Sequence, residues 1–415
     1  MASNVEKRKL KKILVISYNF PPEGGPAVQR VAKFCKYLRR NGLEVFVLTA
    51  TKRAKITDPS LLENLENIKV SKTRDIGVLF RGDLKKVLRS YFPPDTAALW
   101  RLTAVKKGIR LVERENIDLI FSTSPPHSSH IVAEKIAKKT GIPWVVDFRD
   151  EWSNNPSFYK YASQLQHKLL EKRVLKSCSH IIAVTEKGQN NFEELAGTNN
   201  VSLIRNGFDQ EDFLHLDAEN GTVKKNKITF AYAGRLNELH NPVPFFSALN
   251  LAINQGNIDT EKFCVEIIGS VENRKWLNDF PRLDGIVNFI RYQPHPEMLK
   301  RLAAADALLL FATGMNNTEF FPAKVFEYFK LNKYILAILS QPGELWQVMD
   351  DYGKSYLARE SIIEEIREKF VELYEECKSN KRVKPADDSF VNQFSREAQA
   401  KKLFHIMERS MGNSK

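Results

Sequence analysis

Apolar and polar positions along the chain form two successive sets of strand and helix patterns. Short apolar runs, such as residues 12–17 and 44–49, predict strands that are buried on both faces of a sheet. An amphipathic segment at residues 27–40 predicts the helix that joins these two strands. Further strands are predicted at residues 117–122, 143–147, 180–185, 201–204, 228–233, 264–269, 286–290, 307–311 and 334–339, and further helices at 130–140 and 389–411.

Alternating strands and helices predict an α/β fold with parallel sheets, and 415 residues are enough for two domains with full cores. Residues 217–227 are polar and rich in turn-forming types, which is typical of a linker. We therefore expect an N-terminal domain at residues 1–216 and a C-terminal domain at 226–388. The last segment, 389–415, is expected to pack back on the first domain.

Composition is that of a globular protein, with 43% apolar and 27% charged residues. The four cysteines have no metal-ligand or CxxC spacing, which favours free thiols in a reducing compartment. The charged start of the chain has no signal-peptide core, and no apolar run is long enough to span a bilayer. We expect a cytoplasmic protein, or one that is peripheral on the inner face of the membrane.

The net charge of +13 is concentrated in the first half of the chain. Residues 1–210 carry 36 Lys and Arg against 21 Asp and Glu, whereas residues 211–415 carry 27 against 29. The first domain should therefore meet an anionic membrane surface or an anionic acceptor. Residues 78–92 form a basic amphipathic segment that suits a membrane surface, although an ordinary surface helix has the same pattern. No basic tract with interleaved aromatics is present, so we expect no nucleic-acid partner.

The segment from Glu319 to Ser340 has the most informative chemistry. Pro322 suits the first position of a helix, which would leave Glu319 on the preceding loop and put Lys324 and Glu327 on one helix face. A helix start is an anion site, and carboxylates on either side suit hydroxyl groups, as in a nucleotide-sugar. Spacing alone leaves open that both glutamates are solvated surface charges.

The first predicted strand leads into a loop with Gly24 and Gly25, where backbone could approach a phosphate or sugar or simply turn. The GxGxxG fingerprint of dinucleotide sites is absent, so we set NAD aside. The strand at 143–147 ends in charged residues, at the sheet edge where α/β folds bind ligands. These residues are Asp147, Arg149 and Asp150, although Arg149 could simply pair with either aspartate.

These motifs, taken in order, resemble the retaining GT-B glycosyltransferases of glycosyltransferase family 4 over nearly the whole chain. The matching landmarks are PPEGGPAVQRVAKFCKYL after the first strand, the Asn206-Gly207 turn, YAGRL at 232–236, YQPHPEMLKRLAAAD at 292–306, the pair Glu319-x7-Glu327, and FSREAQAKKLF at 394–404. Two further segments, STSPPHSSH and PWVVDFRDEW, resemble bacterial enzymes that build surface polysaccharide or lipid-linked glycans.

The resemblance implies two facing doubly wound, Rossmann-like domains with an active site in the cleft between them. Glu327 would hold the donor ribose, Glu319 the transferring sugar, and Arg235 the diphosphate. The other donor-binding positions implied are Gly24, Gly25, Asn206, Gly207, His240, Phe320, Phe321, Ala323 and Lys324. No metal or other cofactor is implied, because side chains and a helix dipole neutralise the diphosphate.

Three positions depart from the family pattern. His240 replaces a usual lysine and carries little charge at pH 7 unless its pKa is raised, so Lys324 is expected to supply the second cation. Pro322 replaces a glycine and removes one N–H from the phosphate cradle. Arg149-Asp150 stands in place of His-Asp. We expect Asp150 to contact acceptor or donor hydroxyls and Arg149 an anionic acceptor group, with His127 as a weaker acceptor contact.

The sequence therefore predicts a hexosyltransferase-type enzyme that moves a sugar from a nucleotide-diphosphate donor, with retention, to a glycan or lipid-linked acceptor. The catalytic set is Asp150, Arg235 and Glu319, and the acceptor contacts are His127, Asp147, Arg149 and Asp150. Alternatives are a nucleotide-sugar epimerase or hydrolase on the same scaffold, and a catalytically silent binding protein. The sequence does not specify the sugar, the base, the acceptor or the oligomeric state.

Overall fold

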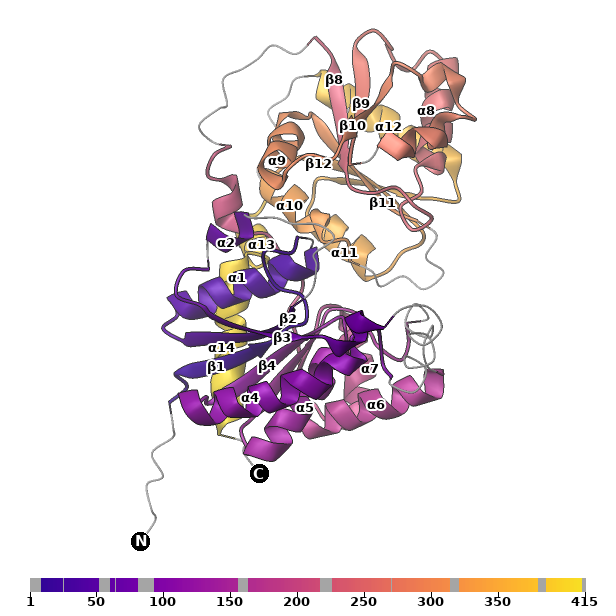
Figure 1. Ribbon diagram of the computed structural model, residues 1–415. Helices are drawn as coiled ribbons and strands as arrows, with labels where there is room; N and C mark the ends of the chain where they lie inside the picture. Colours follow the sequence, from indigo (N-terminus) through magenta and orange to yellow (C-terminus); the bar gives the residue numbers. More distant parts are fainter. Residues whose placement is uncertain are drawn as a thin grey trace. The chain divides into compact units, whose positions relative to one another are not determined.

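The computed structural model divides the chain into two compact units (Figure 1). One unit is Met1–Asn206 together with Arg396–Lys415, and the other is Gly207–Ser395. The boundary therefore comes before residues 217–225, which the sequence analysis assigned to the linker and which are not described. The structure describes residues 9–24, 26–51, 60–63, 65–80, 93–155, 163–216, 226–269, 271–313, 321–379 and 386–412.

The first unit is a seven-stranded parallel sheet with helices on both faces, in the strand order β3-β2-β1-β4-β5-β6-β7. Its strands are β1 (Lys12–Ile16), β2 (Glu44–Thr51), β3 (Lys69–Arg74), β4 (Leu119–Ser124), β5 (Trp144–Phe148), β6 (His180–Ala183) and β7 (Val201–Leu203). Its helices are α1 (Pro26–Arg40), α2 (Ser60–Glu63), α4 (Arg101–Glu115), α5 (Ser128–Thr140), α6 (Gln164–Ser177), α7 (Glu186–Ala196) and α14 (Arg396–Met411).

The second unit is a six-stranded parallel sheet in the order β10-β9-β8-β11-β12-β13. Its strands are β8 (Ile228–Ala233), β9 (Phe263–Gly269), β10 (Val287–Arg291), β11 (Ala307–Ala312), β12 (Tyr334–Leu339) and β13 (Ser355–Arg359). Its helices are α8 (Val243–Asn254), α9 (His295–Ala304), α10 (Lys324–Leu331), α11 (Glu344–Asp351), α12 (Ile363–Lys378) and α13 (Asp388–Asn392).

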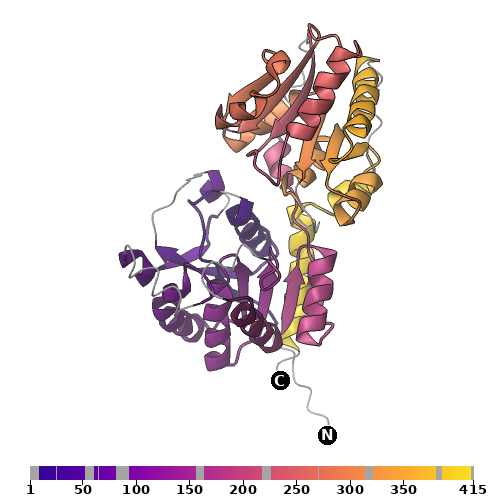
Figure 2. The ribbon, with the colours of Figure 1, turned by 90° about the vertical axis from the view of Figure 1, so that its right-hand side faces the viewer.

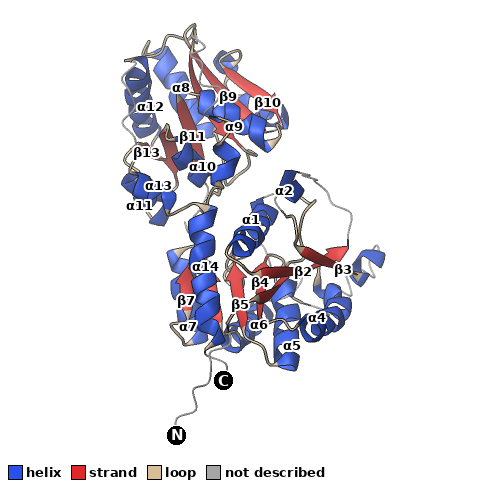
Figure 3. Ribbon diagram, turned by 90° about the vertical axis from the view of Figure 1, so that its left-hand side faces the viewer, coloured by secondary structure: helices blue, strands red, loops and turns tan. Residues whose placement is uncertain are grey.

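Both faces of each sheet are covered, which explains the continuous apolar strands. In the second unit, α8 and α12 pack on one face and α9 and α10 on the other (Figure 3). The six residues of β11 are all buried, as a strand between two helical layers must be. The predicted fold class, two doubly wound parallel-sheet domains, is confirmed.

Two edge strands escaped the sequence analysis. Every residue of β3, KVSKTR, is exposed or half-buried, and five of the six are polar. Of the five residues of β13, SYLAR, one is fully buried. An edge strand has a solvated side and a short hydrophobic face, so its pattern lacks the apolar run that marks a central strand.

The single helix predicted at 389–411 is wrong. The segment forms α13, then a turn in which Ser395 N donates to Asn392 O (3.0 Å), and then α14. Phe394 ends the first part and packs on Phe326 (5.0 Å between ring centroids) in the second unit. Only α14 returns to the first unit, where it lies beside α1 (Figure 2).

A buried ion pair ties α1 to the carboxyl end of β5. Arg30 Nη2 lies 2.7 Å from Asp147 Oδ1, and both side chains are fully buried. The same guanidinium donates to the carbonyls of Ile204 (2.9 Å) and Arg205 (2.7 Å), and Thr123 donates to Asp147 (2.7 Å). Burial alone would raise the pKa of Asp147, but the charge and hydrogen bonds of Arg30 and Thr123 lower it.

Arg30→Met should destabilise the first unit by roughly 3–5 kcal/mol, because it leaves the buried charge of Asp147 without its ion-pair partner. Urea unfolding followed by tryptophan fluorescence measures this change. The double variant Arg30→Met/Asp147→Leu should recover most of the loss, since both charges are then removed. Equal stability of Arg30→Met and wild type would contradict a structural role for this pair.

Candidate active site

The strand order of the second sheet changes direction between β8 and β11. In open parallel sheets, ligands bind at the carboxyl ends of the strands at such a point. The loops that follow these two strands are joined by hydrogen bonds from Asn241 N to Thr313 Oγ1 (2.7 Å) and from Thr313 N to Leu239 O (3.1 Å). This edge is therefore the place to examine for a site within the second unit.

Two glycines let backbone and side chain approach closely at this edge. Gly234 follows β8 with φ +136°, and a Cβ there would lie 2.7 Å from Lys324 Nζ. Gly269 ends β9 with φ +151°, and a Cβ there would lie 2.6 Å from Gly234 O. Both positions favour glycine because of φ, and at Gly234 the Lys324 ammonium lies directly against the backbone of the loop after β8.

Lys324 is the first residue of α10, and its ammonium faces the end of β8. Nζ donates to the hydroxyl of Tyr232 (2.8 Å) and lies 4.0 Å from the centre of the Tyr232 ring. Burial lowers the pKa of Lys324 to about 7, although the charge of Glu327 acts in the opposite direction. An anion placed here would therefore favour the protonated form near neutral pH.

His240 and Arg235 lie on the loop after β8, and the charge of Lys324 acts on His240. Nδ1 of His240 lies 2.8 Å from Phe311 O. Burial and the charge of Lys324 lower the pKa of His240, so its imidazole is neutral at pH 7. Arg235 is exposed, and its carbonyl accepts a hydrogen bond from the Tyr232 hydroxyl (3.2 Å). The cations at this edge in the described residues thus include Lys324 and Arg235, and their part in donor binding stays a prediction.

Glu327 lies in the first turn of α10, where it meets a histidine that the sequence analysis missed. His295 begins α9, and its Nε2 lies 2.8 Å from Glu327 Oε1. The only sequence signal for His295 was its place in the YQPHPEMLKRLAAAD landmark. α10 begins at Lys324, two residues later than predicted, because Pro322 belongs to the preceding turn, in which its carbonyl accepts from Val325 N (3.1 Å). Glu327 therefore lies in the first turn of α10, where its negative charge interacts favourably with the helix dipole.

The remaining donor-binding candidates have different placements. Phe321 is buried and stacks on Phe326 (5.4 Å), and Ala323 caps α10. Asn206 belongs to the first unit, where its carbonyl accepts from Gln399 (2.8 Å), whereas Gly207 begins the second. Gly24 lies half-buried in the loop after β1. The other three candidates, Gly25, Glu319 and Phe320, lie outside the described residues.

The carboxyl end of β5 corrects part of the predicted acceptor set. Asp147 is fully buried against Arg30 and presents no carboxylate oxygen to a ligand. Arg149 is also buried, and it donates to the carbonyls of Ser124 and Pro125 (2.7 Å for the latter). Asp147 is held within β5 and Arg149 within the loop that follows, and the contacts of both are structural. Asp150 remains half-buried at the loop surface, and burial raises its pKa.

His127, which the sequence analysis gave as a weaker acceptor contact, is a buried residue. Its ring is buried and stacks on Trp152 (4.6 Å between centroids, 4° between planes), and burial lowers its pKa far below the usual value. Trp152 Nε1 donates to His167 Nδ1 (2.8 Å), and Glu171 accepts from Ser153 N (3.1 Å). These contacts fix the loop that carries Asp150, and no sequence pattern distinguished His167 or Glu171.

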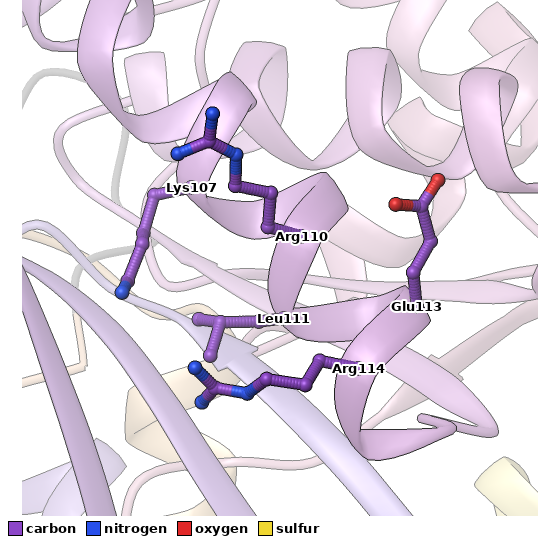
Figure 4. A pocket seen from close by; sticks show the side chains of 5 residues that line it. All are labelled: Lys107, Arg110, Leu111, Glu113 and Arg114. Carbon is purple, nitrogen blue, oxygen red and sulfur yellow. The ribbon is translucent and has the colours of Figure 1, made fainter.

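A shallow groove of about 540 Å³ lies along α4 and is lined by Lys107, Arg110, Leu111, Glu113 and Arg114 (Figure 4). Its residues come from consecutive turns of one helix in the first unit. Arg114 pairs with Glu115 (2.7 Å), so part of the groove's positive charge is already neutralised. The groove has no part in the edge described above.

Comparisons with known proteins agree with the fold. Residues 25–212 match the family model described as Glycosyltransferase Family 4. The first unit is therefore similar to the domain that this family model describes. The family 4 match falls on the first unit and ends just after the chain enters the second. The sequence matches no curated protein.

Beyond the family 4 match, solved structures cover both units. Sucrose-phosphate synthase from Thermosynechococcus elongatus matches 96% of this chain and 98% of its own (TM-score 0.68, 13% identity). HepE from Anabaena, solved in complex with UDP-glucose, matches 95% of this chain and 98% of its own (TM-score 0.62, 15% identity). A putative UDP-N-acetylglucosamine 2-epimerase from Listeria monocytogenes matches 95% of this chain and 94% of its own (TM-score 0.53, 12% identity). At these identities the likeness shows the GT-B fold and does not choose among these activities.

Among the residues that the structure describes, no helix is long and apolar enough to cross a membrane.

Proposed function

We propose that the protein is a retaining glycosyltransferase that moves a hexosyl group from a nucleotide-diphosphate donor to a glycan or lipid-linked acceptor in the synthesis of a surface polysaccharide. One observation carries the proposal: at the switch point of the second sheet the Lys324 ammonium lies against the backbone of Gly234, within reach of the charge of Glu327, and Arg235 follows Gly234 on the same loop. Two cations beside an open backbone suit a diphosphate, and a carboxylate next to them suits ribose hydroxyls.

Each group has a proposed role. Lys324 and Arg235 bind the diphosphate and stabilise the nucleotide as it leaves, and Glu327 binds the ribose. Glu319 holds the transferring sugar, with backbone N–H groups of Phe320, Phe321 and Ala323 beside it. Asp150 of the first unit contacts a reacting hydroxyl. No metal is part of the proposal, because the two cations and the helix start supply the positive charge.

Features of the first unit support an anionic, membrane-linked acceptor. Residues 1–210, the first half of the chain, carry a net charge of +15 (36 Lys and Arg against 21 Asp and Glu). On α6, Leu165 and Leu169 are exposed by 66% and 62%, one turn apart, and exposed Lys168 and Lys172 neighbour them. Residues 81–92, most of the predicted basic segment, lie outside the described residues. An apolar pair among lysines suits an anionic lipid surface on the cytoplasmic side.

A donor screen tests the function. Incubation with UDP-glucose, GDP-mannose and ADP-glucose, each with and without a bacterial lipid extract, is expected to release nucleotide diphosphate from one donor, and faster with the extract. The lipid fraction should gain the labelled sugar. No release from any donor, and no binding of any of them by calorimetry, would contradict the proposal.

The epimerase or hydrolase alternative draws support from the Listeria epimerase, which has the same fold. It predicts donor turnover that is complete without acceptor, with an epimerised sugar or free sugar as the product. Product analysis by NMR in the acceptor-free arm of the screen distinguishes this alternative from transfer. A silent binding protein would bind the donor in calorimetry and give no product in either arm.

A further inference from the structure

The hydroxyl of Tyr232 joins two parts of the proposed donor site. It donates to the carbonyl of Arg235 (3.2 Å) and accepts from the ammonium of Lys324 (2.8 Å). The ring below it is fully buried and stacks on Phe311 (4.8 Å between centroids, 23° between planes). Core packing of the ring therefore fixes the position of the Tyr232 hydroxyl. This hydroxyl is the part of Tyr232 that contacts Lys324 and the loop after β8.

The direction of these hydrogen bonds is set by chemistry. An ammonium only donates and a carbonyl only accepts, so the hydroxyl proton points to Arg235 and a lone pair points to Lys324. Without the hydroxyl, a phenylalanine ring would fill the same core space and leave the ammonium without this acceptor. Core packing therefore explains the ring of Tyr232, but the hydroxyl requires a separate reason.

We propose that Tyr232 is a positioning residue, whose hydroxyl fixes the Lys324 ammonium relative to the loop of Arg235 so that both cations meet one diphosphate. This inference rests on the proposed function and deepens it. Tyr232 touches neither donor nor acceptor in this scheme, and it acts through Lys324.

Other groups also face the Lys324 ammonium. Glu327 on α10 favours the charged form, whereas His240 on the loop after β8 is neutral at pH 7. Burial of the Lys324 ammonium disfavours its charged form and lowers its pKa. The Tyr232 hydroxyl accepts a hydrogen bond from the protonated ammonium (2.8 Å), so its removal should lower the pKa of Lys324 further.

The test compares Tyr232→Phe with a matched control, Tyr328→Phe. The hydroxyl of Tyr328 is also buried between α10 and β8, but it accepts from the backbone N of Ala233 (3.2 Å). Two quantities are measured: the titration of Lys324 by NMR of ¹³C-labelled lysine, assigned with Lys324→Gln, and the affinity for UDP-glucose from pH 6.5 to 8.5. The pyrophosphate of UDP-glucose does not titrate in this range.

Tyr232→Phe is expected to move the Lys324 midpoint to lower pH and to weaken UDP-glucose binding roughly tenfold at pH 7.5, because a hydrogen bond to a charged group is lost. The loss should shrink at pH 6.5. Tyr328→Phe should leave both quantities unchanged. In a Lys324→Gln background, Tyr232→Phe should cost no further affinity, which a purely structural role would not predict.

Two outcomes separate the inference from the proposed function. If Tyr232→Phe leaves both the Lys324 titration and the affinity at wild-type values, the positioning role is overturned. If Tyr232→Phe shifts the titration but wild type binds no nucleotide-sugar, Tyr232 still positions Lys324 and the donor site itself is rejected. Melting temperatures of both tyrosine variants confirm that the compared proteins are folded.

Discussion

Replacing Lys324 with methionine is expected to lower kcat/KM for the donor by roughly 1000-fold at pH 7, the upper range for loss of one preorganised charge at a leaving group. Methionine keeps the apolar stem beside Tyr232 and removes the ammonium. Initial rates of nucleotide release, measured over a range of donor concentrations, give the change. The reduction should appear in both kcat and KM, because the diphosphate is bound in the ground state and gains charge as it leaves.

The pH dependence of donor binding gives an independent view of Lys324. Its pKa near 7 means that the ammonium is charged below pH 7 and loses its proton as pH rises through 7. Wild type should therefore bind UDP-glucose most tightly below pH 7 and more weakly above it, whereas Lys324→Met should show a flat profile. Lys330→Met, on the same helix, is the matched control and should keep the wild-type rate and profile. A Lys324→Met enzyme with wild-type kcat/KM would remove this lysine from the site.

The sequence predicted central strands better than edges, for a physical reason. β8 and β12 occur where they were expected, because strands between helical layers are apolar on both faces. The edge strand β3 has only half-buried and exposed residues, so its apolar pattern is weak. The break between α13 and α14 was missed because the segment stays amphipathic while its packing partners change from one unit to the other.

Within the candidate site, residues close in sequence were easier to predict than contacts between distant elements. Lys324 and Glu327 lie three apart on one helix, so periodicity alone brought them together. The contact of His295 with Glu327 joins helices 32 positions apart, and that of Lys324 with Tyr232 spans 92. Asp147 was misjudged for the same reason: its partner Arg30 lies 117 positions away, and only the fold shows that this charge is buried and paired.

Removing the carboxylate of Glu327 should have a comparably large effect, on binding rather than on the chemical step. Two hydrogen bonds from ribose hydroxyls to a carboxylate contribute about 1.5–3 kcal/mol each, so Glu327→Ala should weaken nucleoside-diphosphate binding by roughly 100-fold or more. Calorimetry with UDP, GDP and ADP measures the loss. kcat at saturating donor should change far less, because the ribose lies away from the bond that breaks.

The control must show that the loss comes from the ligand contact and not from breaking the pair with His295. Glu266 on β9 also pairs with a residue of α9, Arg301 (3.4 Å), and like Glu327 it is half-buried, but no described contact joins it to Lys324 or Gly234. Glu266→Ala should therefore cost stability similar to Glu327→Ala and leave affinity unchanged. Glu327→Gln, which retains an acceptor oxygen, should bind with intermediate affinity. Wild-type affinity in Glu327→Ala would show that this carboxylate does not bind the ribose, since helix packing alone would then account for its contact with His295.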